Sequence, residues 1–559
     1  MKKIQYILIL ILIAAFTSCS EDFLVKDNLY KISDANYYSN PEQIDAALAA
    51  SYACIPLDAG NNDPILLANL MSDDCFGGGG TNDNGFHDTD AFTNSTDSYY
   101  YTVWDVSYQG ILRANMIIKR FDNAEYSDEV AKNQALGEAY FLRGYFYLRL
   151  AQLFGNVPLV VSPEPQDLPK AEASELFGQI LYDFKTASDL MSATKFADMP
   201  DERLGHATKW AAEGMAARAF LFYTGKYNQT EAVLADGSTL TKNDVIAMVD
   251  DCVANSGHKL VSDFRNLWPY AYANQTYKYA VDNNLNWVGD DKGNTETVFS
   301  INFSPDGGWN APNKLSYSNQ LTLYMSVRTG GKSFVQDFGQ GWGGGIANPQ
   351  LYNSFEDGDL RKAGSILNVK DPLEGDIYHW YQFPVGDDST LWDADNTVHE
   401  TGFWQKKYSS IMVDGTGMYD YMLGVGTQSN LQLWNMQDEV ILRFADILLM
   451  GAELGSSKAQ DYFDQIRTRA GLATKPVSLE AIKAERRHEL AFEGIRYFDL
   501  LRWHDEDAAF AAVKDVPVLN AGQEDTYTST YRSETNGFLP IPEQEIALSK
   551  GYLEQNPGW

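Results

Sequence analysis

The stretch that decides the fold is ERRHELAFEGIRYFDLLRW, which spans residues 485–503. Acidic and basic residues stand three apart in it at three places: Arg486 with Glu489, Glu493 with Arg496, and Asp499 with Arg502. Apolar residues at 490, 497, 498 and 501 fall on one helical face. We therefore expect one ion-paired helix over residues 478–503, in which Gly494 permits a close neighbour. Because these carboxylates alternate with arginines, they indicate a structural scaffold rather than a catalytic pair.

A block of helical periodicity precedes this stretch at residues 35–258. Apolar residues recur at the three-and-four spacing of a helix in four segments: 104–121, 128–154, 174–191 and 208–223. We expect Gly225 to end the last of these helices. Successive helix pairs of this length resemble tetratricopeptide-like repeats, although the strict signature of that repeat is absent.

The composition changes between residues 259 and 436, where glycine, asparagine, aspartate and aromatic residues dominate. Residues 297–303 (TVFSINF) read as a strand between turns. We expect a loop-rich, partly β region here. Helical patterning returns from residue 437 and is followed by an extended tail. The apolar run at 440–454 contains Arg443 and Asp446, so it does not predict a transmembrane helix.

Six further motifs, together with residues 485–503, carry a resemblance to a known family. They are AYFLRGYFYL at 139–148, FGNVPL at 154–159, RFADILLM at 443–450, RTRAG at 467–471, LPIP at 539–542 and QNPG at 555–558. On these motifs, which cover both helical blocks, the chain resembles the SusD/RagB family of surface lipoproteins. Four residues depart from the family's usual ones, at positions to which we assign no ligand contact: Asp446, Gly451, Ser549 and Trp559.

The resemblance implies a single SusD-like domain over residues 35–559. Its fold would be mainly α, a tetratricopeptide-like helical-repeat scaffold with a loop-rich, partly β insertion. Within it, residues 35–258 would form an N-terminal helical block, 259–436 a variable region, and 437–559 a C-terminal helical block and tail.

The resemblance also implies a function. Members of this family bind oligosaccharides, or in some cases peptides, at the cell surface. They act as a lid on a SusC-like TonB-dependent outer-membrane transporter and have no catalytic activity of their own. We therefore expect capture of an oligosaccharide or polysaccharide and its delivery to such a partner. A peptide-binding uptake protein is the alternative, and a surface glycoside hydrolase is a less favoured one.

The first 19 residues read as an export signal. Lys2 and Lys3 precede an apolar run at residues 4–16, which is too short to span a bilayer, and then Thr17-Ser18-Cys19. This pattern resembles a lipoprotein signal peptide over residues 1–18, with lipidation at Cys19 and a lipid-anchored tether over 19–34. An ordinary secreted protein with a nearby cysteine is the alternative. By resemblance, the acidic residues after Cys19 imply an outer-membrane protein that faces the cell exterior.

The net charge of −33 excludes some partners. A chain this acidic repels nucleic acid and anionic lipid headgroups. Membrane attachment would therefore rest on the lipid anchor alone. Three cysteines remain after the signal: Cys54, Cys75 and Cys252. Their spacing gives no zinc pattern, and either one bridge between Cys54 and Cys75 or three free thiols is compatible with it.

Sugar binding requires flat aromatic rings together with carboxylate, amide or hydroxyl partners. Three places offer this mixture: Asp73 and Asp74 before the glycine run 77–80, Tyr100 and Trp104 after it, and the glycine-flanked Trp309 and Trp342. We expect the glycine run to be a flexible loop. For each of these six candidates, packing in the core is the competing interpretation.

A calcium ion is the one cofactor for which the sequence offers ligands. Asp88 and Asp90, or Asp290 and Asp291, could join an oxygen-ligand calcium site, although neither pair completes an EF-hand pattern. The seven histidines show no metal-binding spacing. We expect no other cofactor.

Overall fold

The computed structural model describes residues 37–559 except for 59–62, 94–98, 165, 304–317, 329–337, 339–340, 376–396, 410–411, 414–416 and 419–434. The expected signal peptide, the lipidation site Cys19, the tether and the candidate Trp309 lie outside the described residues.

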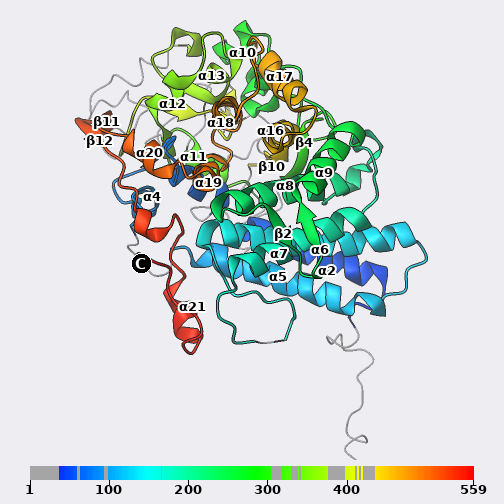
Figure 1. Cartoon of the computed structure of the whole chain (residues 1–559). Coiled ribbons are helices and arrows are strands. Elements are labelled where there is room, and N and C mark those ends of the chain that lie inside the picture. Colours follow the sequence, from blue (N-terminus) through cyan, green and yellow to red (C-terminus); the bar gives the residue numbers. More distant parts are fainter. Residues whose placement is uncertain are drawn as a thin grey trace, which may run out of the picture.

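A group of long helices forms the scaffold. They are α2 (Pro41–Tyr52), α5 (Tyr101–Arg120), α6 (Glu129–Phe154), α7 (Ala173–Leu190), α8 (Lys209–Lys226) and α9 (Lys242–Asn255). Helices α2, α5, α6 and α7 lie in the lower part of Figure 1, with α8 and α9 above them. From α5 onward, each of these helices packs on the next one in the chain. The mainly α, tetratricopeptide-like fold is therefore confirmed.

Side-chain caps explain where two of the longest helices begin. The Asp128 carboxylate accepts a hydrogen bond from Val130 N–H at the start of α6, and the Thr208 hydroxyl accepts one from Ala211 N–H at the start of α8. The predicted end of α8 at Gly225 is wrong, because the helix continues to Lys226. Gly225 serves packing instead, since a Cβ there would collide with the Arg502 carbonyl of α19 (Arg496–Trp503).

The stretch 485–503 forms two helices rather than one. It contains the end of α18 (Leu479–Glu489), then a turn, then α19. Phe492 and Gly494 have φ values of 65° and 69° in this turn, which a helix cannot accommodate. A Cβ on Gly494 would lie 2.9 Å from the Cα of Ile65 in α3 (Pro64–Leu70), so the turn lets the chain pass close to α3.

The second helical group occupies the upper part of Figure 1 and begins with a strand. Strand β10 (Glu439–Arg443) pairs antiparallel with β4 (Thr297–Ile301), which confirms the predicted strand at 297–303. Helices α16 (Phe444–Leu454), α17 (Ala459–Arg469), α18, α19 and α20 (Glu506–Ala511) follow. The tail contains the hairpin β11 (Val516–Asn520) and β12 (Gln523–Tyr527), and then α21 (Glu543–Leu548).

The middle of the chain, together with residues 64–90 between α2 and α5, is built from short elements. The strand pairs of this region are β1 (Cys75–Gly78) with β5 (Gly344–Ala347), β6 (Ile366–Asn368) with β7 (Phe403–Gln405), and β8 (Met412–Val413) with β9 (Gly417–Met418). A further pair, β2 (Glu231–Val233) with β3 (Thr239–Thr241), lies beside the scaffold. Its helices are α3, α4 (Asn84–Asp90), α10 (Lys278–Asp282), α11 (Leu321–Met325), α12 (Pro349–Ser354) and α13 (Leu360–Ser365). These elements surround a second hydrophobic core, separate from that of the scaffold.

The structure settles two further expectations, one about the glycine run and one about the cysteines. The glycine run 77–80 is not a flexible loop, because it is buried and its first half lies in β1. Cys54, Cys75 and Cys252 are buried and form no disulfide, so the alternative without a bridge between Cys54 and Cys75 holds.

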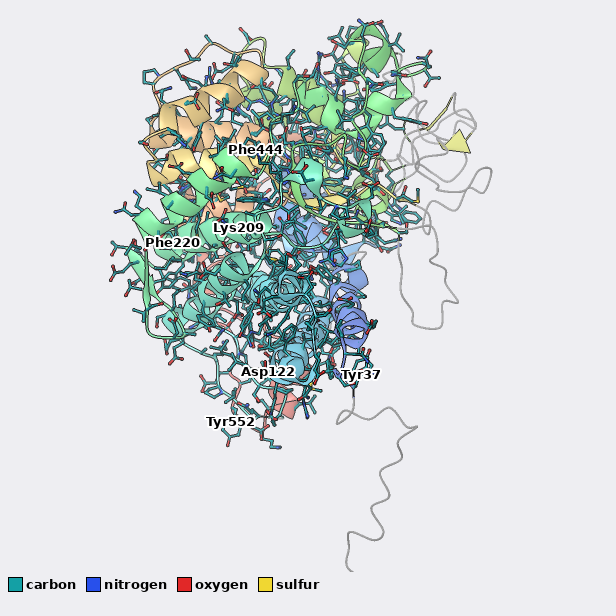
Figure 2. The ribbon with its side chains drawn as sticks, turned by 90° about the vertical axis from the view of Figure 1, so that its right-hand side faces the viewer. Tyr37, Asp122, Lys209, Phe220, Phe444 and Tyr552 are labelled. Atoms are coloured by element: carbon teal, nitrogen blue, oxygen red, sulfur yellow. The ribbon has the colours of Figure 1, made fainter. Side chains whose placement is uncertain are left out.

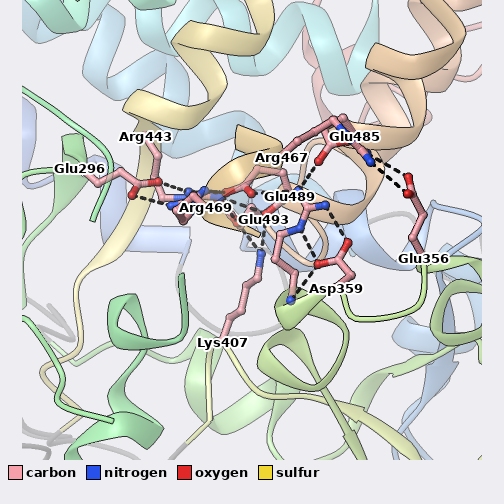
Figure 3. A network of polar contacts seen from close by, with 11 residues as sticks. Glu296, Glu356, Asp359, Lys407, Arg443, Arg467, Arg469, Glu485, Glu489 and Glu493 are labelled. Carbon is pink, nitrogen blue, oxygen red and sulfur yellow. Dashed lines mark hydrogen bonds and ion pairs between the residues drawn. The ribbon is translucent and has the colours of Figure 1, made fainter. Parts of the chain in front are cut away.

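A buried ionic network joins the middle of the chain to the second helical group (Figure 3). Its members are Glu296, Glu356, Asp359, Arg361, Lys407, Arg443, Arg467, Arg469, Glu485, Glu489 and Glu493. Glu489 lies at its centre, 2.5 Å from Arg469 and 3.0 Å from Arg443. Burial raises the pKa of Glu489, but Arg469, Arg443 and Arg361 outweigh that effect and hold the pKa well below its ordinary value. Removing one partner would leave uncompensated buried charge, so the network fixes the two parts together.

Candidate functional site

A group of partly buried aromatic and polar side chains lies where β1 and β5 pair and α4 and α11 meet them. We call this group the aromatic rim; its members are Asp83, His87, Tyr99, Tyr324, Arg328 and Trp342. Helix α4 contacts β1, and α11 contacts β5, so the strand pair brings together segments about 245 residues apart. Gly85 leaves room for the Tyr99 ring, which would collide with a Cβ at that position.

Arg328 holds the centre of the aromatic rim. Its Nη1 donates to the Asp83 carboxylate at 3.0 Å and to the Trp342 carbonyl at 3.1 Å. The guanidinium carbon lies 5.9 Å from the centre of the Trp342 ring. The approach depends on Gly80, where a Cβ would lie 2.6 Å from Arg328 Nη2.

Tyr324 rests on the second core, and Tyr99 rests on the core of the scaffold. Phe86, buried beneath them, meets Tyr324 edge-on at 5.8 Å, and Tyr99 meets the buried Tyr100 at 5.0 Å. Burial raises the pKa of Tyr99 and of Tyr324, so both phenols stay neutral and can donate hydrogen bonds. Rings fixed in this way present flat faces to a ligand, and Asp83 and Arg328 supply an acceptor and donors beside them.

A histidine corner borders the aromatic rim. The His87 and His399 rings are 5.5 Å apart, and His399 Nδ1 lies 3.8 Å from the Asp90 carboxylate. Burial, aided by His87, lowers the pKa of His399 to about 4. Asp90 accepts from Gly77 N–H at 2.7 Å and from the Tyr527 hydroxyl at 2.6 Å, yet burial raises its pKa to about 7. His399 is therefore neutral at neutral pH, whereas Asp90 is about half ionised there.

The structure gives four of the predicted ligand residues a structural role. Asp73 and Asp74 are only 5% and 2% exposed, and their carboxylates face guanidinium groups: Arg496 lies 2.8 Å from Asp73, and Arg487 lies 2.5 Å from Asp74. These carboxylates hold α18 and α19 against the start of β1, so the expectation that they accept hydroxyl protons from a ligand is corrected.

The other two of these four candidates pack in the core of the scaffold. Tyr100 is 3% exposed, and its hydroxyl lies 3.1 Å from the Thr89 hydroxyl. Trp104 is equally buried and meets Phe154 edge-on at 5.2 Å. Core packing, the competing interpretation, therefore describes both rings.

Trp342 is partly exposed and lies beside Arg328, which approaches Gly80 of the glycine run. The glycine run and Trp342 are therefore brought together, although mostly through other side chains than those predicted. Asp83, His87, Tyr324 and Arg328 were missed. The exposed polar run around Asp83 was a usable signal, whereas the pairing of Asp83 with Arg328 follows only from the β1–β5 register.

Oxygen ligands for a hard cation converge at Asp290 and Asp438. The Asp438 N–H donates to the Asp290 carboxylate at 3.0 Å, and the Ser300 hydroxyl donates to the Asp438 carboxylate at 3.1 Å. Burial, and then the charge of Asp290, raise the pKa of Asp438 well above its ordinary value. Within the described residues, no group of three or more His, Cys, Asp or Glu side chains could hold a metal, so an ion here would also need amide, hydroxyl or carbonyl oxygens.

The other aspartates considered for calcium are engaged elsewhere. The Asp88 carboxylate accepts from the Thr93 hydroxyl at 2.9 Å, and the Asp291 carboxylate accepts from Gly293 N–H at 2.8 Å. None of the helices in the described part of the chain has the length and hydropathy needed to cross a bilayer.

Comparisons with known proteins agree with this fold. The family model described as "SusD family" matches residues 295–559, and the model described as "Starch-binding associating with outer membrane" matches residues 44–221. "SusD-like protein P2" of Formosa agariphila is 22% identical to this chain over the whole length of both.

Two solved structures show the likeness in three dimensions. "Surface glycan-binding protein A from Bacteroides fluxus" superposes with a TM-score of 0.70 at 24% identity, covering 93% of this chain and 99% of that one. "Surface glycan-binding protein A from Bacteroides thetaiotaomicron in complex with laminarihexaose" gives 0.67 at 21% identity, covering 92% and 99%. The chain belongs to the SusD family.

Proposed function

We propose that this protein captures a neutral glycan at the aromatic rim and delivers it to a TonB-dependent outer-membrane transporter, for which it serves as a lid. It does so without catalytic activity, from the outer face of the outer membrane, where lipid on Cys19 anchors it. The observation that carries this proposal is the aromatic rim itself, in which Tyr99, Tyr324 and Trp342 are partly exposed around the Arg328–Asp83 pair.

The chemistry of the rim favours a sugar over other ligands. Flat rings stack on the apolar C–H faces of a sugar ring, and a carboxylate beside a guanidinium offers acceptors and donors for neighbouring hydroxyls. The relatives support this assignment, since one of them has been solved with laminarihexaose. A peptide would bring backbone groups that seek an open strand edge, and the rim side of β1 and β5 offers rings and side chains instead.

The charge of the molecule favours a neutral glycan. Asp83 already neutralises Arg328, and the chain as a whole carries −33. An anionic polysaccharide would meet long-range repulsion, and Arg328, the guanidinium of the rim, is already paired with Asp83. We expect any binding of a uronic-acid polymer such as alginate to be weak and to strengthen with added salt, which screens repulsion.

A hydrolase would need two carboxyl groups about 5–10 Å apart across a cleft. Asp83 is the carboxylate of the rim, and it is paired with Arg328. The recognisable carboxylates of residues 485–503 are also engaged, since Glu489, Glu493 and Asp499 pair with arginines. Release of reducing sugar by the purified protein would contradict the proposal that it is not an enzyme.

We also propose that Asp290 and Asp438 bind a structural calcium ion. Two carboxylates that would otherwise repel each other, with the Ser300 hydroxyl beside them, suit a hard cation that prefers oxygen ligands.

Calorimetry with laminarihexaose and a panel of neutral polysaccharides tests the glycan proposal. We expect the wild type to bind and Trp342→Ala to bind at least tenfold more weakly, because the stacking platform is lost. Tyr272→Ala removes an exposed ring outside the rim and should bind as the wild type does. Binding that Trp342→Ala leaves unchanged would contradict the rim as the site.

A further inference from the structure

A second groove lies between α5 and the C-terminal tail. We call it the α5–α21 groove; its walls include Trp104, Asp105 and Tyr108 of α5, Glu545 and Leu548 of α21, and Tyr552 just beyond that helix. Its cavity volume is about 250 Å³, and it is open to solvent along one side. The aromatic rim lies beside Tyr101, the first residue of α5. Tyr108 lies about 10 Å further along the same helix. The groove is therefore a separate place on the surface.

The outer edge of the groove is unusually apolar. Leu548 is 71% exposed and Tyr552 is 51% exposed, although both residues are large. They stand on a helix and turn that project from the body of the molecule, at the lower left of Figure 1. Tyr552 lies at the same end of the molecule as Tyr37 and Asp122 in Figure 2. Two neighbouring exposed apolar side chains at the mouth of a groove indicate a binding role.

The floor of the groove is rigid. The Trp104 ring is buried, packs 5.0 Å from the Tyr108 ring, and hydrogen-bonds to the Glu545 carboxylate. The Tyr108 hydroxyl donates to the Pro158 carbonyl at 2.8 Å. Trp104 is therefore a positioning residue, which holds Glu545 toward the groove.

Carboxylates supply the polar side of the groove. Asp105 accepts from the Gln109 amide at 2.8 Å, and burial, followed by the charge of Asp105, raises the pKa of Glu545. Among the described residues that line the groove there is no lysine or arginine, while Lys550 at its edge pairs with Asp167 at 2.9 Å. Both carboxylates thus retain acceptor capacity for donors brought by a ligand.

We propose that the α5–α21 groove is a second saccharide site, with Tyr552 as the stacking platform and Asp105 and Glu545 as acceptors of sugar hydroxyl protons. This inference rests on the proposed glycan-binding function and extends it, because two sites would let the protein hold a longer chain. A lysine- or arginine-rich protein segment also donates to carboxylates, but it would leave the flat, half-exposed ring without a matching apolar face.

Calorimetry in the Trp342→Ala background isolates the groove, because binding at the aromatic rim is then weakened. With laminarihexaose as the probe, we expect residual binding that Tyr552→Ala weakens about tenfold or more. Tyr552→Phe should retain it, since the ring stacks and the hydroxyl is dispensable. The matched control is Tyr272→Ala, which removes a 40%-exposed ring elsewhere and should change nothing. Equal melting temperatures would show that all variants fold.

Each outcome decides between the two proposals. Residual binding that Tyr552→Ala leaves unchanged overturns the groove and spares the rim. Binding that Tyr552→Ala abolishes while Trp342→Ala has no effect overturns the rim and spares the groove. If the wild type binds trilysine in a Tyr552-dependent way and no glycan, the groove serves a basic protein segment and the saccharide proposal is wrong. Absence of any glycan binding by the wild type overturns both.

Discussion

Arg496 and Asp73, 423 residues apart in the chain, form a two-point ion pair. Arg496 Nε lies 2.8 Å from one Asp73 oxygen, and Nη2 lies 2.9 Å from the other. Arg487 reaches the same carboxylate at 3.3 Å, and its pKa is raised because Asp74 and Asp73 outweigh burial. The pair fixes α19 of the second helical group to the chain that leads into β1. Because the aromatic rim lies at β1, the pair also helps to hold the rim in place.

Asp73→Ala is expected to destabilise the protein by about 3–5 kcal/mol, because it leaves two buried guanidinium groups short of a partner. Urea denaturation measures the change in the free energy of unfolding. Asp167→Ala is the matched control, since it breaks a solvent-exposed pair with Lys550. Its cost should be at most about 1 kcal/mol. Equal losses in the two variants would contradict the structural role of Asp73.

Gly80→Ala is expected to weaken glycan binding about tenfold without lowering the melting temperature. A Cβ at this position would lie 2.6 Å from Arg328 Nη2, which is the far end of a flexible side chain. Arg328 would move away from Trp342, and the backbone would remain in place. Calorimetry and thermal melting separate the two effects. Asn82→Ala, at an exposed position in the same turn, should leave both quantities unchanged.

The pKa of Asp90 predicts a pH dependence of stability. The folded pKa is about 7, against an ordinary value of 3.8, so the folded protein holds this proton more tightly than the unfolded chain does. The contribution of Asp90 is therefore fully present below about pH 4 and is lost as the pH rises through 7. Asp90→Asn keeps the neutral form at every pH. We expect the free energy of unfolding of Asp90→Asn minus that of the wild type to increase by about 2–3 kcal/mol between pH 5 and pH 8.

Urea denaturation at the two pH values checks this prediction. Asp236→Asn gives a comparison of opposite sign, because hydrogen bonds from Ser238 lower the pKa of Asp236. The stability that Asp236 contributes is present above its ordinary pKa and is lost as the pH falls through the lowered value. A constant difference between Asp90→Asn and wild type across the range would show that Asp90 does not titrate there.

Removal of calcium is expected to lower the melting temperature of the wild type. The ion would screen the repulsion between the carboxylates of Asp290 and Asp438, and ligands that bind only the folded state stabilise it. Asp438→Asn should make the melting temperature insensitive to a chelator. Asp88→Asn should leave that sensitivity intact, because Asp88 bonds to Thr93 instead. A wild type that melts equally with calcium and with chelator would contradict the site.

Local patterns predicted most of the helices. The segment 128–154 became α6 almost residue for residue, because Asp128 caps it and an unbroken pattern sustains it. The prediction of a single helix over residues 478–503 was wrong, because the cause of its break lies outside the segment. Its break at Phe492 and Gly494 is required by close packing on Ile65, which local spacing does not show.

The sequence correctly predicted that the charged residues of 485–503 form ion pairs, but it assigned most of their partners wrongly. Of the three local pairs, the structure forms Asp499 with Arg502 at 2.8 Å. Arg486 turns instead to Asp446 and Asp499, and Glu493 to Arg443 and Lys407. A buried guanidinium takes the carboxylates that enclose it, and these come from distant elements. The same reason explains why Asp73 and Asp74 were mistaken for ligand residues.

The sequence by itself determined the family, the helical scaffold and the strand at 297–303, and it named three separate places for a ligand. These follow from local spacing, capping and motif residues, each of which acts over a few positions along the chain. Only the tertiary structure decided which polar and aromatic side chains are buried and which face solvent. That choice depends on the register of β1 with β5 and on the docking of α19 against α3, both of which join residues hundreds of positions apart.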